Sequence, residues 1–337
     1  MKRKKLYFLL TSLLSVLLLV AGCGNTTSAG SKKEKATSSE VDYPKKTIKI
    51  IVSYAAGGGS DVQARTLSEA VTKYLPKGAE VIVENKPGGA GTIGLSALTQ
   101  AEPDGYTLGF ASISNLTLQT HYEKTPYKVD DFEPIIQFTS VPSLFLVKED
   151  APWKTYEELI DYIKQNPGKF TFGSNGSGGI THLNIEAVNQ ALGTEMKIAH
   201  FDGSTPTMTA LLGGHVMGVS LQTYDAIPQI EAGKVRPLAI FGTKKTEDFK
   251  DLPLLTDEGM DTGIDSYIGL VAPKGTPKEI ITIVHDAFKQ AMEDKEVIEK
   301  FKTLNTDLSY AGPEEFKKII NDSHQLSGEV MDKSGLK

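Results

Sequence analysis

The sequence predicts an α/β protein of two lobes with a ligand cleft between them. Strands and helices alternate from residue 47 onward, and such alternation is typical of layered α/β folds with mainly parallel strands. Two glycine-rich turns, one in each half of the chain, follow a predicted strand and precede a predicted helix. Because ligands of open α/β sheets bind beyond the carboxyl ends of the strands, a cleft between two lobes would bring both turns onto one ligand.

The first half begins with a buried strand at residues 47–53, which leads through the first glycine turn into a helix at residues 60–74. Apolar residues recur on this helix at the spacing of one helical face, at Leu67, Ala70, Val71 and Tyr74. Further strands are predicted at residues 80–84 and, after a Pro-Asp-Gly turn, at residues 107–111.

The second half repeats this pattern of strands and helices. Thr155 and Glu158 predict a capping box at the start of one helix, and Thr276 and Glu279 predict another, with Pro277 at the first helical position. A further helix is predicted at residues 181–192, and strands are predicted at residues 169–173, 196–200, 216–220 and 235–241.

The N-terminal residues have the pattern of a secretory signal. Four cations at residues 2–5 precede an apolar stretch that ends in small residues before Cys23. At about 15 residues the stretch is shorter than the ~20 needed to span a bilayer, which disfavours an uncleaved membrane anchor. The segment resembles a bacterial lipobox, which implies that residues 1–22 are a signal peptide and that the Cys23 thiol is acylated, for example with palmitate.

Cys23 and the residues after it predict a membrane-anchored protein on a flexible tether. Cys23 is the only cysteine, so an intramolecular disulfide or a multi-cysteine metal site is excluded. Two acyl chains suffice for stable membrane anchoring. Residues 24–42 are rich in Ser, Thr, Lys, Glu and Gly, a composition that cannot bury a core, and would reach about 25 Å on average.

The charge of the chain limits its partners. The full chain has a formal net charge of −6, and residues 1–22 carry four cations and no acidic residue, so the remainder has a net charge of −10. This charge argues against nucleic acid as a partner, which needs a basic face. Any anion would have to be attracted by short-range donors against the long-range field of the protein.

The two glycine turns are the candidate ligand-binding segments. The first, at residues 54–61, joins a strand to a helix N-terminus, where backbone N–H groups and the helix dipole suit a carboxylate. The alternative is a tight turn with an ordinary N-cap at Ser60. The second, at residues 173–179, adds hydroxyl groups, and its alternative is a flexible loop. His182, which follows this turn, could equally be a capping or packing residue.

A third glycine-rich segment, residues 89–94, spells G-x-G-x-x-G after a strand. A dinucleotide site should also show an acidic residue about 20 positions later, and residues 112–118 contain none. A glycine-rich connection is therefore favoured over a dinucleotide-dependent enzyme, which stays the alternative function. The sequence has no phosphate-loop, H-E-x-x-H or G-x-S-x-G motif, and its histidines lack metal-ligand spacing. We expect no catalytic residues, no cofactor and no metal.

Taken in order, several short motifs resemble one family, the substrate-binding receptors of tripartite tricarboxylate transporters, also called Bug-type receptors. They cover nearly the whole chain after the tether: Tyr43-Pro44, residues 55–61 with Ala64-Arg65, residues 83–88 (VENKPG), residues 103–108 (PDGYTL), Gly173-Ser174 with Gly176, Gly178 and His182-Leu183, and Ala272-Pro273 with residues 275–277 (GTP). One departure is Met217, where family members often carry an acidic residue.

The resemblance implies a two-lobed fold of the periplasmic-binding-protein type II, with residues 43–142 and 250–337 in the first lobe and residues 143–249 in the second. It implies capture of a small di- or tricarboxylate and delivery to the permease subunits of a tripartite tricarboxylate transporter. By position, the ligand-binding residues would be Tyr54, Ala55, Ala56, Gly57, Gly58, Gly59 and Asp61 on one side, and Ser174, Ser177, Thr181, His182, Phe201, Asp202 and Gly203 on the other.

Overall fold

The computed structural model describes residues 41–260, 264–304 and 306–336. The predicted signal segment, Cys23 and residues 24–40 of the predicted tether lie outside these described residues. Among the helices that the structure describes, none is both long enough and apolar enough to cross a membrane.

The first lobe is built on a six-stranded sheet with the strand order β11-β4-β10-β3-β1-β2. β1 pairs in parallel with β2 and β3, whereas β10 runs antiparallel to both β3 and β4. The strands are β1 (Ile48–Val52), β2 (Val81–Asn85), β3 (Thr107–Ser112), β4 (Phe132–Val141), β10 (Ser266–Pro273) and β11 (Leu308–Ala311).

Helices cover both faces of this sheet, because its strands are apolar on both sides. One core joins β1 to apolar residues of α1, α8 and α9, such as Leu67, Phe288 and Phe301. The opposite core joins β3 and β10 to α2 and α10, through residues such as Leu95 and Phe316. The helices are α1 (Gly59–Val71), α2 (Thr92–Thr99), α8 (Lys278–Glu293), α9 (Lys295–Thr303) and α10 (Pro313–Ser334), with the short α3 (Gln119–Tyr122) after the π-helical η3 (Ser114–Leu118).

The second lobe is built on a five-stranded sheet with the order β7-β6-β8-β5-β9. Alternate residues of β5 enter opposite cores: Phe145 packs with α4 and α5, and Leu144 packs with α6 and α7. The elements are β5 (Ser143–Lys148), α4 (Tyr156–Gln165), β6 (Thr171–Ser174), α5 (Ile180–Leu192), β7 (Lys197–His200), α6 (Ser204–Leu212), β8 (Gly218–Gln222), α7 (Thr223–Glu231) and β9 (Val235–Phe241).

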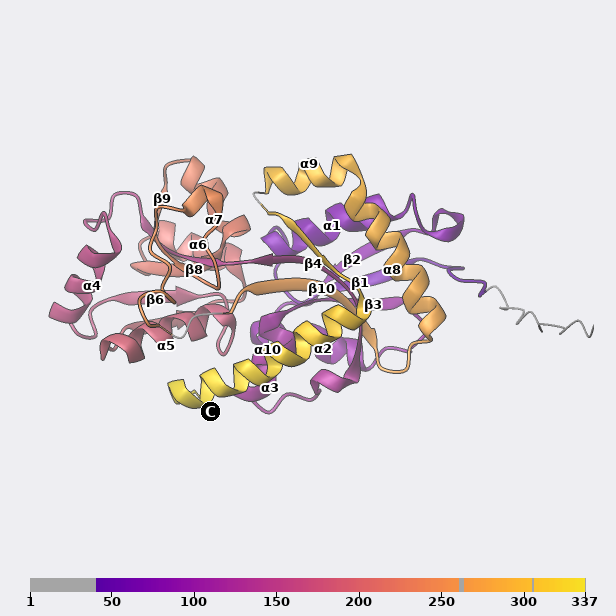
Figure 1. The fold of residues 1–337 in the computed structure, drawn as a ribbon, viewed down its shortest axis with the longest axis horizontal. Helices are drawn as coiled ribbons and strands as arrows, with labels where there is room; N and C mark the ends of the chain where they lie inside the picture. The colour runs from indigo at the N-terminus through magenta and orange to yellow at the C-terminus, as the bar shows by residue number, and fades with distance from the viewer. Residues whose placement is uncertain (1–40, 261–263, 305, 337) are drawn as a thin grey trace, which may run out of the picture. The chain divides into compact units, whose positions relative to one another are not determined.

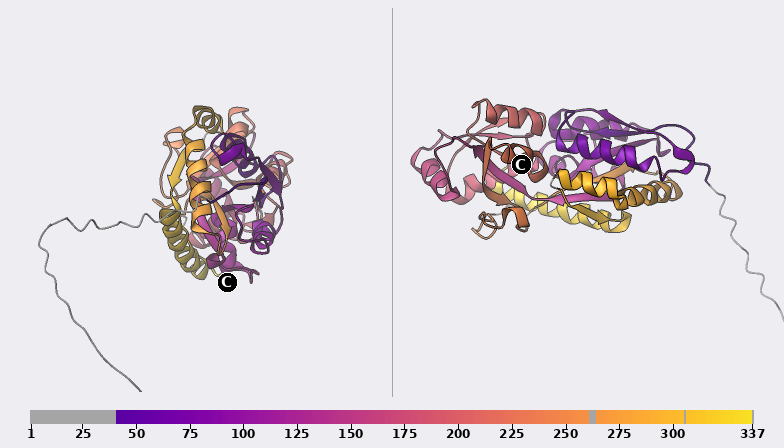
Figure 2. Two further views of the ribbon diagram at one scale, coloured as in Figure 1. Left: turned by 90° about the vertical axis from the view of Figure 1, so that its right-hand side faces the viewer. Right: turned by 90° about the horizontal axis from the view of Figure 1, so that it is seen from above.

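The chain passes between the lobes along its strands. Only Pro142 separates β4 of the first sheet from β5 of the second, and the return path leads from β9 to β10 (Figure 1). Leu254 and Leu255 still pack in the cores of the second sheet. α10 lies against the first lobe and reaches the second lobe (Figure 2). There the Gln190 side chain on α5 donates to the Lys333 carbonyl.

The predicted two-lobed α/β fold is confirmed, but two local predictions are wrong. The strands are mixed rather than mainly parallel, because β10 pairs antiparallel with β3 and β4, and β5 pairs antiparallel with β8 and β9. The second capping box does not form. Pro277 is the N-cap of α8 rather than its first residue, and the Thr276 hydroxyl donates to the Pro273 carbonyl at 2.8 Å instead of capping the helix.

Candidate ligand-binding cleft

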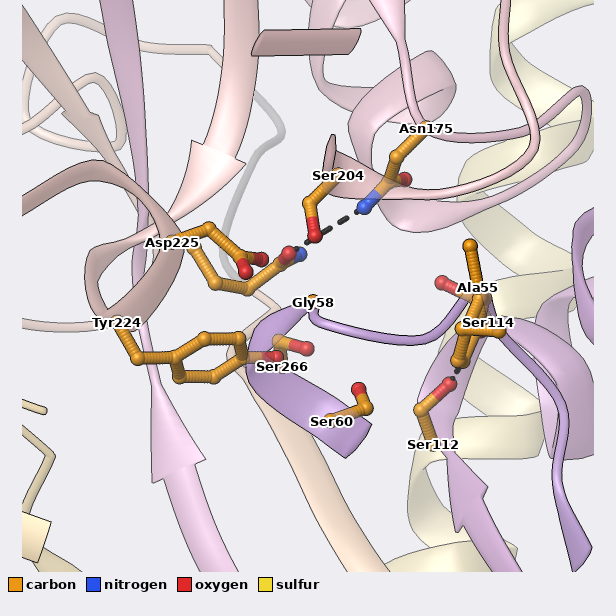
Figure 3. A pocket seen from close by; sticks show the side chains of 12 residues that line it. Ala55, Gly58, Ser60, Ser112, Ser114, Asn175, Ser204, Tyr224, Asp225 and Ser266 are labelled. Carbon is orange, nitrogen blue, oxygen red and sulfur yellow. Dashed lines mark hydrogen bonds between the residues drawn. The ribbon is translucent and has the colours of Figure 1, made fainter. Parts of the chain in front are cut away.

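A cavity of about 390 Å³, including its open side, lies where the two lobes meet. Figure 3 shows its lining, which comes from both lobes. The first lobe contributes Tyr54, Ala55, Gly58, Ser60, Ser112, Ser114 and Ser266, and the second contributes Asn175, Ser204, Gln222, Tyr224 and Asp225.

Three helices begin at this cavity. α1 begins beside Gly58, α6 begins at Ser204, and α7 begins directly after Gln222. The first N–H groups of a helix have no partner within the helix, and each helix dipole places about half a positive charge at this end. Their convergence makes the cavity favourable for an anion.

The side chains in the cavity add neutral hydrogen-bonding groups. The Tyr54 hydroxyl lies 2.7 Å from Ser112 Oγ, and burial raises the pKa of Tyr54 to about 12, so the phenol keeps its proton. Asn175 Nδ2 donates to Gln222 Oε1 at 3.3 Å. Within the described lining there is no Lys, Arg or His. An anion here would be held by backbone N–H groups, hydroxyls and amides rather than by a cation.

A buried polar network holds the first glycine turn in place. Gly57 has a φ of 80°, which favours glycine, and its N–H donates to Asp61 Oδ2 at 2.9 Å. Asn85 Nδ2 donates to both Asp61 Oδ1 and the Tyr54 carbonyl, and Arg65 forms an ion pair with Asp61 at 2.9 Å. Burial alone would raise the pKa of Asp61, but the hydrogen bonds from Arg65, Gly57 and Asn85 outweigh it and lower the pKa.

The predicted residues of this turn therefore divide into two groups. Tyr54, Ala55 and Gly58 line the cavity, and the Gly59 N–H donates to Asp225 Oδ1 of the other lobe at 2.8 Å. Ala56, Gly57 and Asp61 are not among the lining residues that the structure describes. Two cationic side chains, Arg65 and Lys86, form ion pairs with Asp61 and Glu84, respectively.

In the second turn, most of the residues predicted to bind the ligand already form hydrogen bonds with other groups of the protein. Thr181 Oγ1 donates to Asn175 Oδ1, His182 Nδ1 accepts from the Gly178 N–H, and Ser174 Oγ lies 2.7 Å from His200 Nδ1. Ser177 Oγ lies 2.8 Å from the Tyr122 hydroxyl of the first lobe. Of the described residues in this turn, only Asn175 lines the cavity.

Residues of the first lobe also cover the start of α5. The Ile180 N–H donates to Ser114 Oγ at 3.1 Å, and Gln119 donates to the Ser177 carbonyl. The N-terminus of α5 is thus occupied by first-lobe side chains, which explains why this glycine turn does not open onto the cavity as the first one does.

The remaining predicted residues lie nearby. Ser177, Phe201 and Asp202 line a second cavity of about 710 Å³, including its open side, together with His200 and residues of the first lobe such as Ala90. Gly203 precedes α6, and a Cβ there would lie 3.7 Å from the Ala55 nitrogen. The structure thus places these residues beside the first cavity rather than among its described lining.

Sequence reasoning missed the contribution of α6 and α7. Ser204, Gln222, Tyr224 and Asp225 line the cavity because two helices of the second lobe begin opposite α1. Ser204-Thr205-Pro206 is a helix-start signal that could have located α6. Nothing local in the sequence indicates that these helix ends face α1.

Known proteins share the sequence pattern and the fold of this chain. Residues 63–336 match the model of the tripartite tricarboxylate transporter family receptor. The chain belongs to this family. The receptor is 34% identical to a protein from the gbd 5′ region of Cupriavidus necator, over 87% of the receptor and 89% of that protein. It is 30% identical to BugT of Bordetella pertussis, over 88% and 91% of the two chains.

Solved structures share the fold. The periplasmic binding protein BugD superimposes with a TM-score of 0.82 at 30% identity, covering 88% of the receptor and 99% of BugD. A periplasmic transporter superimposes equally well at 33% identity, with the same coverage. Members of this extracytoplasmic family are solute-binding receptors rather than enzymes.

The segment that suggested a dinucleotide site has a structural role. Gly89–Gly91 forms the 3-10 turn η2 ahead of α2, and a Cβ on Gly91 would contact the Asn115 side chain at 2.8 Å. Close packing against Asn115 and a φ of 92° account for glycine at this position without a bound cofactor.

Proposed function

We propose that the receptor captures a small carboxylate in the cavity lined by α1, α6 and α7 and delivers it to the permease of a tripartite tricarboxylate transporter. One observation carries the proposal: three helix N-termini from two lobes converge on one small polar cavity. The family to which the chain belongs, named for tricarboxylates, supports the substrate class and the permease partner.

Binding measurements on a panel of acids test the substrate class. The secreted Cys23→Ser protein would be titrated calorimetrically with mono-, di- and tricarboxylates, and with sugars of similar size. We expect saturable binding of at least one carboxylate and none of a sugar. Binding of a sugar with no response to any carboxylate would contradict the proposal.

A pair of variants on α1 tests whether the acid binds at this cavity. Ser60→Ala removes a hydroxyl of the lining, and we expect it to weaken binding about fivefold, as the loss of one hydrogen bond does. Thr66→Ala is the matched control, because its hydroxyl donates to Val62 of its own helix at 2.9 Å. Equal affinities for the two variants would place the acid elsewhere.

We further propose that Cys23 is acylated and that residues 24–42 tether the receptor near its permease. The proposal rests on the cationic and apolar residues before Cys23 and on the polar composition after it. We expect the Cys23→Ser protein to bind the same acid with unchanged affinity but to leave the membrane fraction. Retention of that protein at the membrane would contradict the anchor.

A further inference from the structure

The described lining of the cavity holds one charged side chain, and that side chain is an acid. Asp225 lies in the first turn of α7, and Figure 3 shows it with Tyr224 and Ser204. Its Oδ1 accepts the Gly59 N–H of the first lobe at 2.8 Å, and its carboxyl group also accepts a hydrogen bond from Ser204. The carboxyl group therefore lies where α1, α6 and α7 begin, which is where the proposed function places the carboxylate of the ligand.

No cation of the described lining faces Asp225. On α1, Arg65 forms an ion pair with Asp61 at 2.9 Å, behind the glycine turn, and α6 has no charged residue. The other titratable groups of the lining are the phenols of Tyr54 and Tyr224, and burial raises the pKa of both, so they stay neutral. An ionised Asp225 is therefore stabilised by hydrogen bonds alone.

Binding of an acid in this cavity brings two carboxyl groups together. Asp225 is only partly exposed and lines the cavity, so an acid that fills the cavity displaces water from it. When two carboxyl groups share such a site, one of them takes up a proton, because two like charges at short range strongly disfavour each other. Burial already raises the pKa of Asp225 to about 6. Asp225 therefore needs a smaller further shift than the carboxylate of the ligand, whose ordinary pKa is about 4.

We propose that the receptor takes up one proton with each acid that it binds, and that Asp225 holds this proton. The proton comes from the solvent and forms an O–H bond on the Asp225 carboxyl group. That hydroxyl donates to an oxygen of the ligand carboxylate, while Oδ1 keeps accepting the Gly59 N–H. The inference rests on the proposed function, because it uses the same cavity, and it adds that capture of the acid is coupled to pH.

Calorimetric titrations of the secreted Cys23→Ser protein count the proton directly. Each acid of the panel that binds, beginning with succinate and glutarate, would be titrated in two buffers of different ionisation enthalpy. The carboxyl groups of these acids are ionised above about pH 7, so any proton taken up belongs to the protein. At pH 7.5 we expect uptake of about one proton per bound acid. From pH 7 to 8.5 the affinity should fall about tenfold for each pH unit, as linkage to one proton requires.

Asp225→Asn imitates the protonated side chain, because its amide oxygen can accept the Gly59 N–H while its amide N–H donates to the acid. We expect no proton uptake and an affinity that stays constant from pH 7 to 8.5. At pH 8.5 this variant should bind the acid at least about tenfold more tightly than the unmodified receptor. Asp225→Ser, measured beside it, also removes the carboxyl group and should likewise show no proton uptake, which keeps the test valid if Asp225→Asn does not fold.

Glu231→Gln is the matched control, because it removes the same charge from the exposed last residue of α7. We expect it to keep both the proton uptake and the pH dependence of the affinity. If no acid binds at any pH, the proposed function itself fails. If an acid binds without proton uptake, or if the uptake persists in Asp225→Asn or Asp225→Ser, only the role of Asp225 is overturned.

Discussion

At the scale of single residues, the cleft depends on positions where the two lobes touch. Gly59 is the clearest example, because it is the first residue of α1 and lies against the ring of Tyr224 from the second lobe. A Cβ at Gly59 would overlap that ring. Asp225 meets the same residue through the Gly59 N–H.

Gly59→Ala should prevent the lobes from closing. The backbone of Gly59 is helical and tolerates alanine, so we expect the circular dichroism spectrum to be unchanged. Ligand affinity should fall at least about tenfold, because the added methyl group and the Tyr224 ring cannot share one space. Tyr224→Ala in the same protein should recover part of the affinity in calorimetric titrations. A Gly59→Ala protein with full affinity would show that these contacts do not form in the ligand-bound state.

The pH dependence of stability should report on Asp225. Burial raises the pKa of its carboxyl group from 3.8 to about 6, against the opposing hydrogen bonds from Gly59 and Ser204. Because the pKa of Asp225 is higher in the folded protein than in the unfolded chain, folding favours the protonated carboxyl group. Its contribution to the free energy of unfolding is fully present below pH 3.8 and is lost as the pH rises through about 6. The loss should be roughly 1–3 kcal/mol.

Asp225→Asn therefore should raise the melting temperature at pH 7.5 and leave it nearly unchanged at pH 4. Thermal melts of the ligand-free proteins across this range test the sign. A difference that stays constant with pH would mean that the carboxyl group titrates normally.

At the scale of elements, the first glycine turn and α1 act together. Asp61 connects them, because it accepts the Gly57 N–H, the Asn85 amide and the Arg65 guanidinium from its buried position. Sequence reasoning located this turn and the strand before it, since a buried apolar strand followed by glycines is a local pattern. The family resemblance placed Asp61 on the ligand side. The network behind the turn was not predicted, because it involves Asn85, which is distant in sequence.

Asp61→Ala should destabilise the protein by about 2 kcal/mol, since three donors lose a charged acceptor. It should also weaken ligand binding, because the turn would no longer be held at the cavity. Urea unfolding measures the first effect and titration the second. Glu69→Ala, on the exposed face of the same helix, should change stability by less than about 0.5 kcal/mol. Similar losses for both variants would contradict the role of the network.

The starts of α6 and α7 could not be assigned to the cleft from the sequence. Both helices follow strands of the second sheet, and the chain connects that sheet to the first through the passages from β4 to β5 and from β9 to β10. The second glycine turn was expected at the ligand because it joins a predicted strand to a predicted helix, carries hydroxyl groups and matches the family resemblance. In the structure, Ser114 and Tyr122 of the first lobe form hydrogen bonds with Ile180 and Ser177 at this turn.

At the scale of the whole molecule, the charge distribution sets how an anion arrives. The chain from Cys23 onward has a net charge of −10, and the described cavity lining adds no cation. Attraction is thus confined to the short range of the helix ends and hydroxyl groups.

Higher ionic strength should leave the association rate of an acid unchanged or raise it. Salt screens the repulsion between two negative partners, and the change from about 0.02 to about 0.2 M shortens the Debye length severalfold. Stopped-flow measurements at constant pH test this. A rate that falls steeply with salt would reveal a cationic cluster that steers the ligand.

The two-lobed fold itself was predictable, because alternating strands and helices and the order of family motifs extend over most of the chain. The central claim is that neutral donors at the starts of α1, α6 and α7 hold the carboxylate. A crystal structure with the tightest-binding acid tests it most directly. We expect carboxylate oxygens within hydrogen-bond distance of backbone N–H groups beside Gly58 and Ser204. A ligand found in the cavity beside His200 and Phe201, or paired with a Lys or Arg side chain, would contradict it.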